Sequence, residues 1–382
     1  MRATVKAVGL GVSTIPPACQ LVVGFTRTGE VLAELPGDPD YTDTLNAAGT
    51  ATATIPLDAV PAEVDLRAVT APWRCFLAVT RGRAVMWAGP IVTRRRQPGS
   101  DQIEIGATGL WSIFDRRVLA RLGNFGYADE QADILLTNLT LPSIAAEILR
   151  IATNRPGGDL PLLLPASVAG TNQRSYYGYE LAPAGQRLTQ LVGVDGGPDC
   201  HFLPSWTPDG ARIQWTTRLG NPYLGQLGSE YVFDHGAGLV DWGSDEDAST
   251  MSTTALVPGD GMEHGRLIGT ATDNTLVNAG WPALDLVNSD HTDVKDQSTV
   301  DAYARAYQNA YRAGIELDTA VVRADTDPAP GTYLVGDDAV FQPQPDRWNP
   351  AGPLRRRITQ ISRRSSGPDV ISLTLAPMPI SL

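Results

Sequence analysis

The sequence predicts an α+β, mainly β fold, in which two related antiparallel β-barrels carry inserted α/β and helical segments. Three observations lead to this prediction. The 38 glycines and 29 prolines among 382 residues favour many short strands joined by turns over a helical bundle. Short stretches of alternating apolar and polar residues recur near both ends of the chain. A hairpin-like segment occurs twice, once in each of these regions.

The first predicted domain, residues 1–118, is a small β-barrel. Strands are expected at residues 21–25, 31–35, 51–55, 76–80, 85–95 and 103–105, each bounded by turn residues. Gly89-Pro90 interrupts one strand where a bulge or kink would bend it. At the N-terminus, Arg2 and Lys6 precede an apolar stretch that glycines and prolines break up, so no signal peptide is expected. No run of about 18 apolar residues predicts a membrane span.

The second predicted domain, residues 119–240, is of the α/β class, with helices at 143–153 and 186–192. The third, residues 241–382, is a second β-barrel with a helical insert at about 286–325. Its helix, 298–313, has Ser298 or Thr299 as N-cap and Gly314 just past its end. The apolar and tyrosine stripe of this helix is expected to pack on its own sheet. Strands are predicted at 253–257, 267–272, 275–278, 333–335, 340–341, 354–361 and 370–375.

The repeated segment is the observation that links the two barrels. Residues 95–105 and 363–373 share the pattern R-R-x-x-G-x-D-x-I-x-[IL], and an alternating strand precedes each copy. Each copy reads as a hairpin whose glycine, Gly99 or Gly367, takes a positive φ in the turn. Asp101 and Asp369 occupy equivalent positions after the turn. One copy closes the first β-region and the other closes the chain, which favours two related barrels.

No group of residues predicts catalysis. The net charge of −12, from 30 basic and 42 acidic residues, argues against a protein that grips nucleic-acid phosphates. Nucleophile-elbow, zinc-protease, Walker and dinucleotide-binding patterns are all missing, and the four histidines are scattered. We therefore expect no catalytic, metal-binding or cofactor-binding residues, and we predict that the protein is not an enzyme.

Charged runs are expected to be solvated. The acidic residues do not fit the EF-hand pattern, and the arginine runs at 94–96 and 355–357 lack interleaved aromatic residues. The acidic runs are Asp241, Asp245, Glu246 and Asp247, and then Asp290, Asp293 and Asp296. Two alternatives stay open: a cell-wall (peptidoglycan) hydrolase using a carboxylate pair, and a carbohydrate-binding module using some of the eight tryptophans and eleven tyrosines.

Both ends of the chain resemble one family. Residues 87–91, Trp-Ala-Gly-Pro-Ile, a hairpin, and residues 109–117, Gly-Leu-Trp-Ser-Ile-Phe-Asp-Arg-Arg, resemble the first barrel of the tail hub (baseplate hub, minor tail) proteins of long-tailed bacteriophages. Residues 331–337, 357–361 and 371–377 are similar to the end of those proteins. The barrel and hub motif that the resemblance implies consists of Trp87, Gly89, Pro90, Ile91, Gly99, Asp101, Tyr333, Gly336, Asp337, Gly367 and Asp369.

The resemblance also implies a function. In that family two tube-type barrels per chain assemble as a homotrimer, so that three chains present six barrels to a hexameric tail tube. This chain would then be a structural virion protein at the distal tip of a siphophage tail, assembled in the host cytoplasm. Its expected partners are the distal tail protein, the tape-measure protein, and tail fibres or other minor tail proteins. Genomic DNA would pass through its channel without specific binding, and acidic groups in the lumen would limit sticking.

Overall fold

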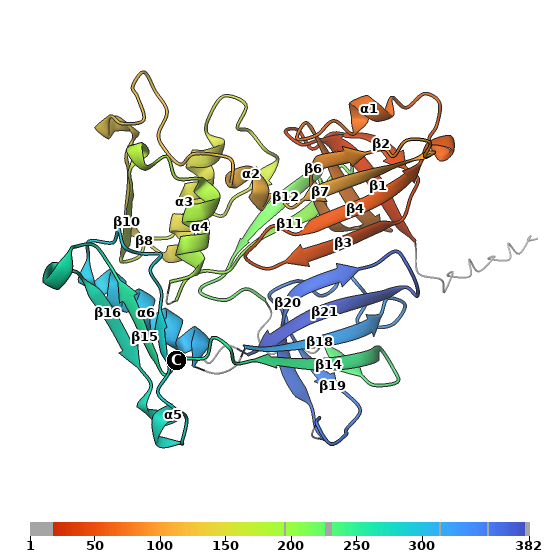
Figure 1. The fold of residues 1–382 in the computed structure, drawn as a ribbon. Helices are drawn as coiled ribbons and strands as arrows, with labels where there is room; N and C mark the ends of the chain where they lie inside the picture. The colour runs from red at the N-terminus through yellow and green to blue at the C-terminus, as the bar shows by residue number, and fades with distance from the viewer. Residues whose placement is uncertain (1–17, 195, 226–230, 313–314, 350, 379–382) are drawn as a thin grey trace, which may run out of the picture.

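The structure is a computed structural model that describes residues 18–194, 196–225, 231–312, 315–349 and 351–378 (Figure 1). The N-terminal stretch for which no signal peptide is expected, residues 1–17, lies outside this part. Thirteen described strands join in one sheet that runs from one end of the chain to the other. Three smaller sheets belong to two insertions.

The first barrel is built from seven strands in the order β3-β4-β7-β6-β5-β1-β2, all antiparallel. Alternation places one side of each strand in the core: Ala51, Ala53 and Ile55 of β4 are buried, whereas the threonines between them are exposed. The strands are β1 (Cys19–Phe25), β2 (Val31–Leu35), β3 (Pro39–Thr44), β4 (Thr50–Pro56), β5 (Cys75–Arg81), β6 (Ala84–Arg95) and β7 (Gln102–Thr108). A short helix, α1 (Leu66–Val69), connects β4 to β5.

The second barrel repeats this arrangement. Its strands are β13 (Val232–Asp234), β14 (Leu239–Asp247), β18 (Ile315–Arg323), β19 (Asp338–Gln342), β20 (Leu354–Arg363) and β21 (Val370–Pro377). They lie in the order β14-β18-β21-β20-β19-β13. Five strands of the two barrels therefore correspond in chain order: β3 to β14, β4 to β18, β5 to β19, β6 to β20 and β7 to β21. β13 takes the place of β1, although it pairs parallel with β19 and not antiparallel. The predicted fold class is confirmed.

An α/β insertion follows the first barrel in the chain and packs beside it (Figure 1). Its longest helix ends at the predicted residue, Thr153, but begins at Leu141, two residues before the predicted start, because the Thr140 hydroxyl caps it by accepting a hydrogen bond from the Ser143 amide and Pro142 stands in the first turn. The elements are α2 (Trp111–Phe114), β8 (Ile134–Leu139), α3 (Leu141–Thr153), β9 (Leu162–Leu163), β10 (Asn172–Tyr176), α4 (Ala184–Val192), β11 (Cys200–Trp206) and β12 (Ile213–Leu219). Short 3-10 turns lie at Leu57–Ala59, Glu130–Ala132, Gly178–Glu180 and Glu263–Gly265.

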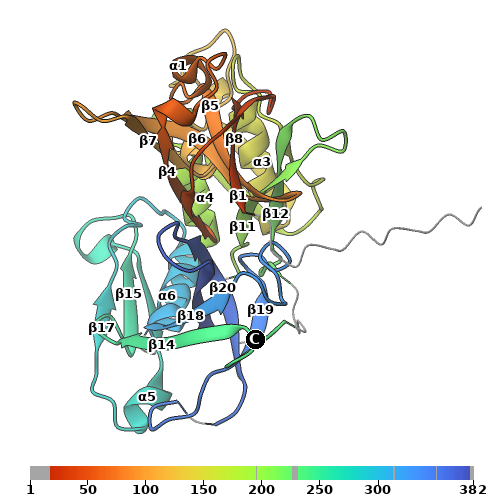
Figure 2. The same ribbon diagram turned by 90° about the vertical axis from the view of Figure 1, so that its right-hand side faces the viewer.

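A second insertion stands between β14 and β18. It contains β15 (Thr254–Pro258), β16 (Ile268–Thr272), α5 (Asn274–Asn278), β17 (Asp285–Val287) and α6 (Gln297–Tyr311). As predicted, α6 lies against its own small sheet (Figure 2), with Val300 and Ala304 fully buried and Tyr303 stacked on His291 at 3.7 Å between ring centroids. The N-cap is Asp296 and not Ser298 or Thr299, since its carboxylate accepts the Thr299 amide. The predicted C-cap, Gly314, lies outside the described residues.

Several predicted ranges need correction. Residues 275–278 form α5 and not a strand, because Asp273 caps a helical turn there. Residues 333–335 form a loop in which Tyr333 makes only an isolated bridge. The range 286–325 is wrong for the helical insert: the insertion follows β14 directly, and β18 within that range is a barrel strand whose Ala320 and Val322 are fully buried. β13 already pairs with β19 before residue 240. The division at 118 and 240 stays a prediction.

Candidate assembly site at the junction of the barrels

Strand β20 belongs to both barrels. Residues 354–357 pair with β19, residues 360–363 pair with β3 along the same edge, and β21 runs along the other edge. A β-bulge between Ile358 and Gln360 lies where the partner changes. Here the Leu45 amide donates to the carbonyl of Thr359 at 2.9 Å. The two barrels are therefore joined by main-chain hydrogen bonds within one sheet, and one hydrophobic core continues through both.

Charged side chains fasten this seam. The guanidinium of Arg363 donates to the Asp38 carboxylate at 2.7 Å, to the carbonyl of Pro39 at 2.8 Å and to Asp369 at 3.4 Å. Arg81 donates two hydrogen bonds to Asp369, at 2.6 and 3.3 Å. Burial alone would lower the pKa of Arg363, but the hydrogen bonds to Asp38 and Asp369 raise it above its ordinary value. The guanidinium thus stays charged, and it crosslinks β3 to the β20–β21 turn.

A second buried cluster connects the α/β insertion to the seam. Asp199 accepts hydrogen bonds from the Leu224 amide at 2.7 Å, from the Asn46 side chain at 3.0 Å and from Arg357. Arg357 also donates to the carbonyl of Gly336 at 3.2 Å. Asp199 and Arg357 are 6% and 8% exposed, so the pair is removed from bulk water. The expectation that the 355–357 run is solvated is wrong for Arg357, because its guanidinium finds a carboxylate and carbonyl acceptors in the interior.

The predicted motif residues of the first barrel line its core. Trp87 and Ile91 are buried at 2% and 0% exposure, and Pro90 pairs with Phe76 across β5 and β6. A Cβ atom on Gly89 would lie 2.0 Å from the carbonyl oxygen of Thr108. Only a residue without a side chain allows the end of β7 to approach β6 so closely.

We expect Gly89→Ala to destabilise the first barrel by about 1–3 kcal/mol, because the methyl group must displace backbone. Urea unfolding followed by circular dichroism measures the loss. Gly265→Ala is the matched control, since a Cβ there meets no atom within 4 Å. Equal stabilities of the two variants would contradict the close approach.

The remaining motif residues divide between the turns and the seam. Gly99 and Gly367 have φ of 74° and 108° in equivalent turns. Asp369 belongs to the Arg363 cluster, whereas Asp101 accepts the Leu57 amide through its backbone carbonyl. Gly336 also has a positive φ, 94°.

Two further motif residues flank Gly336. Tyr333 is 1% exposed and meets Phe233 edge-on at 5.4 Å. Asp337 accepts the Leu334 amide at 2.9 Å and lies 3.6 Å from Arg218 of the α/β insertion. The motif residues from the end of the chain thus lie near the junction: Tyr333, Gly336, Asp337, Gly367 and Asp369. The residues from 87 to 91 lie within the first barrel.

Residues beyond the predicted motif hold the junction together. Asp38, Asn46, Arg81, Asp199 and Arg357 make contacts that no local pattern indicates, because each partner is far away in sequence. The repeat could have drawn attention to Arg363, which stands in its first position.

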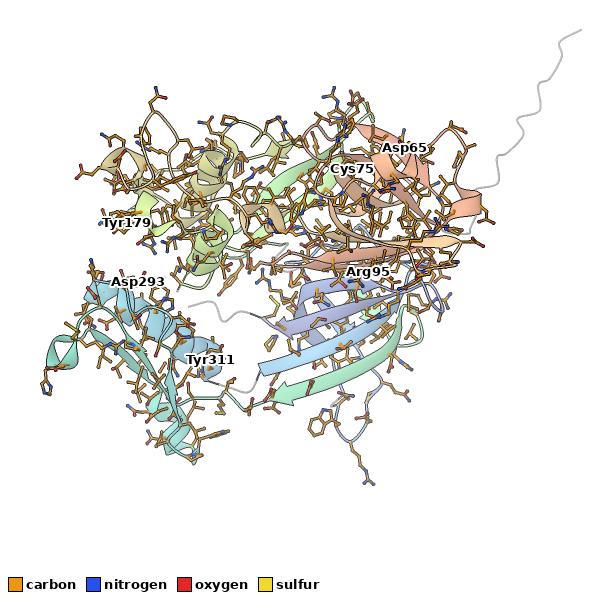
Figure 3. All side chains as sticks on the ribbon, turned by 45° about the horizontal axis from the view of Figure 1, so that its top comes forward. Asp65, Cys75, Arg95, Tyr179, Asp293 and Tyr311 are labelled. Atoms are coloured by element: carbon orange, nitrogen blue, oxygen red, sulfur yellow. The ribbon has the colours of Figure 1, made fainter. Side chains whose placement is uncertain are left out.

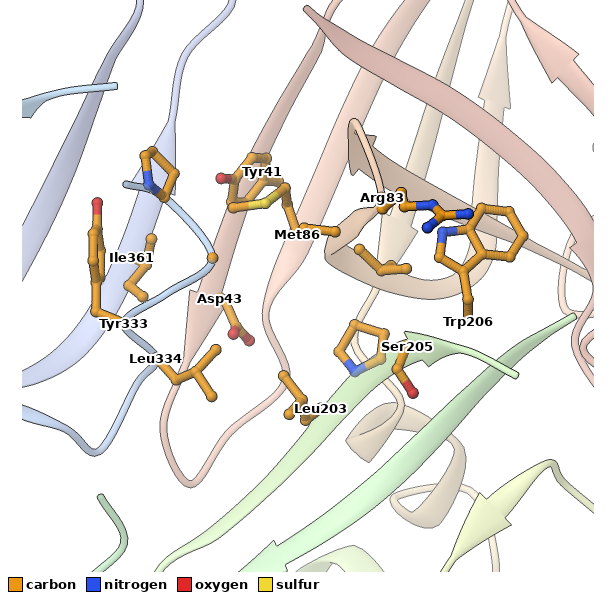
Figure 4. A pocket seen from close by; sticks show the side chains of 15 residues that line it. Tyr41, Asp43, Arg83, Met86, Leu203, Ser205, Trp206, Tyr333, Leu334 and Ile361 are labelled. Carbon is orange, nitrogen blue, oxygen red and sulfur yellow. The ribbon is translucent and has the colours of Figure 1, made fainter. Parts of the chain in front are cut away.

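A cavity of about 370 Å³ lies where both barrels meet β11 (Figure 4). Its walls include Tyr41, Met86, Leu203, Trp206 and Tyr333. Burial raises the pKa of both tyrosines well above the ordinary value, so their hydroxyls stay protonated. The one carboxylate in the wall, Asp43, lies 2.9 Å from the buried His201 ring. These contacts are those of a mainly apolar interface between the two barrels and the α/β insertion.

A second hollow, of about 830 Å³, separates the α/β insertion from the α6 insertion; Tyr179 and Asp293 face each other across it (Figure 3). Of the four acids that line it, Glu180 pairs with Arg187, and hydrogen bonds from Ser298 and Thr299 lower the pKa of Asp296. Among the described residues, no three histidine, cysteine or acidic side chains are grouped to hold a metal. None of the described helices is long and apolar enough to cross a membrane.

The fold is that of solved phage tail proteins. The 43 kDa tail protein of prophage MuSo2 from Shewanella oneidensis is 10% identical, with a TM-score of 0.58 over 94% of this chain and 98% of that one. A tail protein from Neisseria meningitidis is 12% identical, with a TM-score of 0.56 over 94% and 96%. Prophage tail protein gp18 from Listeria monocytogenes is 11% identical, with a TM-score of 0.51 over 95% of each. No family model and no curated protein matches the sequence. The predicted resemblance is confirmed at the level of the fold.

Proposed function

We propose that this chain is a structural virion protein that forms a homotrimeric hub at the distal tip of a phage tail. The observation that supports it most is the duplicated barrel. A hexameric tube offers six equivalent contacts, and a chain with two equivalent barrels meets six contacts with three copies. The full-length structural likeness to phage tail proteins supports the same assignment.

The junction explains how one chain keeps its two barrels in a fixed relation. Main-chain pairing between β3 and β20, the Arg363 cluster and the Asp199–Arg357 cluster hold the barrels as one rigid wall. A rigid wall is what an adaptor between six-fold and three-fold components requires. The proposed partners remain the tail tube or distal tail protein, the tape-measure protein and tail fibres, and the net charge of −12 suits a channel that DNA passes without binding.

The expected assembly is a particle of three 40.7 kDa chains. Mass photometry and light scattering of the purified protein measure its mass, and negative-stain images should show a ring with a central opening. Two results together would contradict the proposal: the protein stays monomeric at high concentration, and it is not incorporated into tails of a phage that lacks the gene for it.

One observation favours the carbohydrate-binding alternative as a second function. Tyr177 and Tyr179, 43% and 59% exposed, stack at 5.3 Å beside the polar hollow of about 830 Å³. Exposed aromatic rings beside polar groups are suited to stacking on sugars. We expect Tyr179→Ala to abolish any binding seen on a glycan array. The control is Trp348→Ala, which removes a 73% exposed aromatic ring that does not line this hollow; an array without signal for the parent protein would reject this function.

A further inference from the structure

The two halves of the duplication do not have the same neighbours. In the second barrel, the edge of β20 at residues 360–363 is covered by β3. The corresponding edge of β6 in the first barrel, at residues 93–96, pairs with no described strand, because β5 begins opposite Pro90 and the Trp73 amide makes the last main-chain hydrogen bond there, to the Ile91 carbonyl. β14, which corresponds to β3, is the outermost strand of the large sheet (Figure 1), and its outer edge is also open. The chain thus contains one filled junction and the two separate halves of a second.

The strand registers show which residues are equivalent. The repeat aligns Ala107 with Leu375; their partners across the sheet are Ala51 and Asp318. The next strands out place Tyr41 opposite Ala51 and Ser244 opposite Asp318. Residues 41–44 of β3 therefore match residues 244–247 of β14.

The bulges give the other half of the register. In β6 the bulge lies between Ile91 and Thr93, and in β20 between Ile358 and Gln360. Aligning them matches residues 93–96 with residues 360–363, one position away from the alignment of the arginine pairs in the sequence repeat. The turn after β6 is accordingly one residue shorter than the turn after β20.

Applying the observed β20–β3 pairing to the open edges gives a specific contact between two copies. Gln360, Ile361, Ser362 and Arg363 pair with Thr44, Asp43, Thr42 and Tyr41. The equivalent pairs are Thr93 with Asp247, Arg94 with Glu246, Arg95 with Asp245, and Arg96 with Ser244. The register was derived from backbone pairing and the sequence repeat, without reference to charge, yet it places Arg94 and Arg95 directly opposite Glu246 and Asp245.

The acids of β14 and Arg95 of β6 are exposed, whereas Arg94 is half-buried and donates to the Arg67 carbonyl at 2.8 Å. Asp245, Glu246 and Asp247 are exposed, and the first two make no ion pair within the described part of the chain. Arg95 is 67% exposed, and its one ion pair, with the exposed Glu104, is long at 3.8 Å. Opposite charges on directly paired strand positions stabilise an antiparallel sheet, and like charges destabilise it.

We propose that β14 of one copy adds antiparallel to the edge of β6 in the next, with Glu246 opposite Arg94 and Asp245 opposite Arg95. Resting on the proposed hub function, the inference names the surface that closes the ring. The contact is head to tail, so each copy both offers and receives an edge, and repetition leads to a closed ring. Main-chain pairing supplies affinity, and the charges fix the register and keep other strands away.

The test exchanges the charges. Variant one carries R95E, variant two carries D245R, and variant three carries both changes, because Arg95 and Asp245 face each other in this register; Arg94 is kept because it also bonds the carbonyl of Arg67 at 2.8 Å. We expect the concentration for half-assembly to rise at least about tenfold in variants one and two and to return toward the parent value in variant three. R121E, with the same charge change as variant one on an exposed arginine elsewhere in the chain, is the control and should assemble like the parent. Circular dichroism verifies folding of each variant.

The outcomes separate this inference from the proposed function. A trimer that survives both single charge reversals overturns the β6–β14 contact and leaves the hub proposal standing. A parent protein that forms no trimer and enters no tail overturns both. Mixing variants one and two provides a further check: like copies repel and unlike copies attract, so an alternating ring of three cannot close. Mass photometry should then show pairs or even-numbered rings, and trimers in the mixture would contradict the contact.

Discussion

The Arg357→Ala variant is expected to lose about 3–5 kcal/mol of unfolding free energy, because it leaves the Asp199 carboxylate buried without its cation. Asp199 is 6% exposed and is held in place by the Leu224 amide and Asn46, so it cannot turn outward to water without breaking these contacts. The α/β insertion should loosen from the seam before the barrels unfold.

Urea unfolding gives the free energy, and limited proteolysis near residue 199 reports the loosening. Arg355→Ala is the control, since its side chain is 52% exposed. If the unfolding free energies of the two variants differ by less than about 1 kcal/mol, the Asp199–Arg357 pair contributes no more than a surface ion pair does. That result would contradict its burial.

The Trp215→Ala variant should lose a similar amount, about 3–5 kcal/mol, through the cavity it leaves. Trp215 is completely buried between β12 and the first barrel, where it meets Phe76 edge-on at 5.9 Å. Its indole nitrogen donates to the carbonyl of Ala88 at 3.2 Å, next to Gly89. The ring thus links the insertion to the barrel wall through both packing and a hydrogen bond.

Thermal unfolding measures this effect, and Trp348→Ala, at 73% exposure, is the control that should change little. Trp215→Phe separates the effect of the lost side-chain volume from that of the lost hydrogen bond to Ala88, because phenylalanine restores most of the packing but has no N–H donor. If the alanine variant unfolds at the parent temperature, the insertion does not depend on this contact.

The fold could be predicted from the sequence because its signals are local. Alternation identified most strands of the first barrel, and the repeat at 95–105 and 363–373 identified the duplication. Local signals failed where tertiary contacts decide. β18 was assigned to the helical insert because a helix with clear caps precedes it, and only the neighbouring β14 and β21 make it a barrel strand.

The junction was harder to predict than the barrels. Arg357 and Arg363 look like solvated arginines in a charged run, and their burial depends on Asp199 and Asp38, which lie 158 and 325 positions away. No spacing rule joins residues at such separations. The arginine run at 94–96 has the same composition, yet Arg95 and Arg96 are exposed, so a run of arginines does not by itself indicate which of them are buried.

The insertion between β14 and β18 has a consequence for symmetry. The equivalent connection in the first barrel, between β3 and β4, is a turn of five residues, 45–49. One half of the duplication therefore carries a lobe where the other is bare. In a closed ring of three such chains, barrels without this insertion would alternate with barrels that carry it. The barrel strands would then repeat every 60° around the ring, whereas the insertions at its periphery would repeat every 120°. The change from one rotational order to the other would then be encoded within each polypeptide and would need no additional protein.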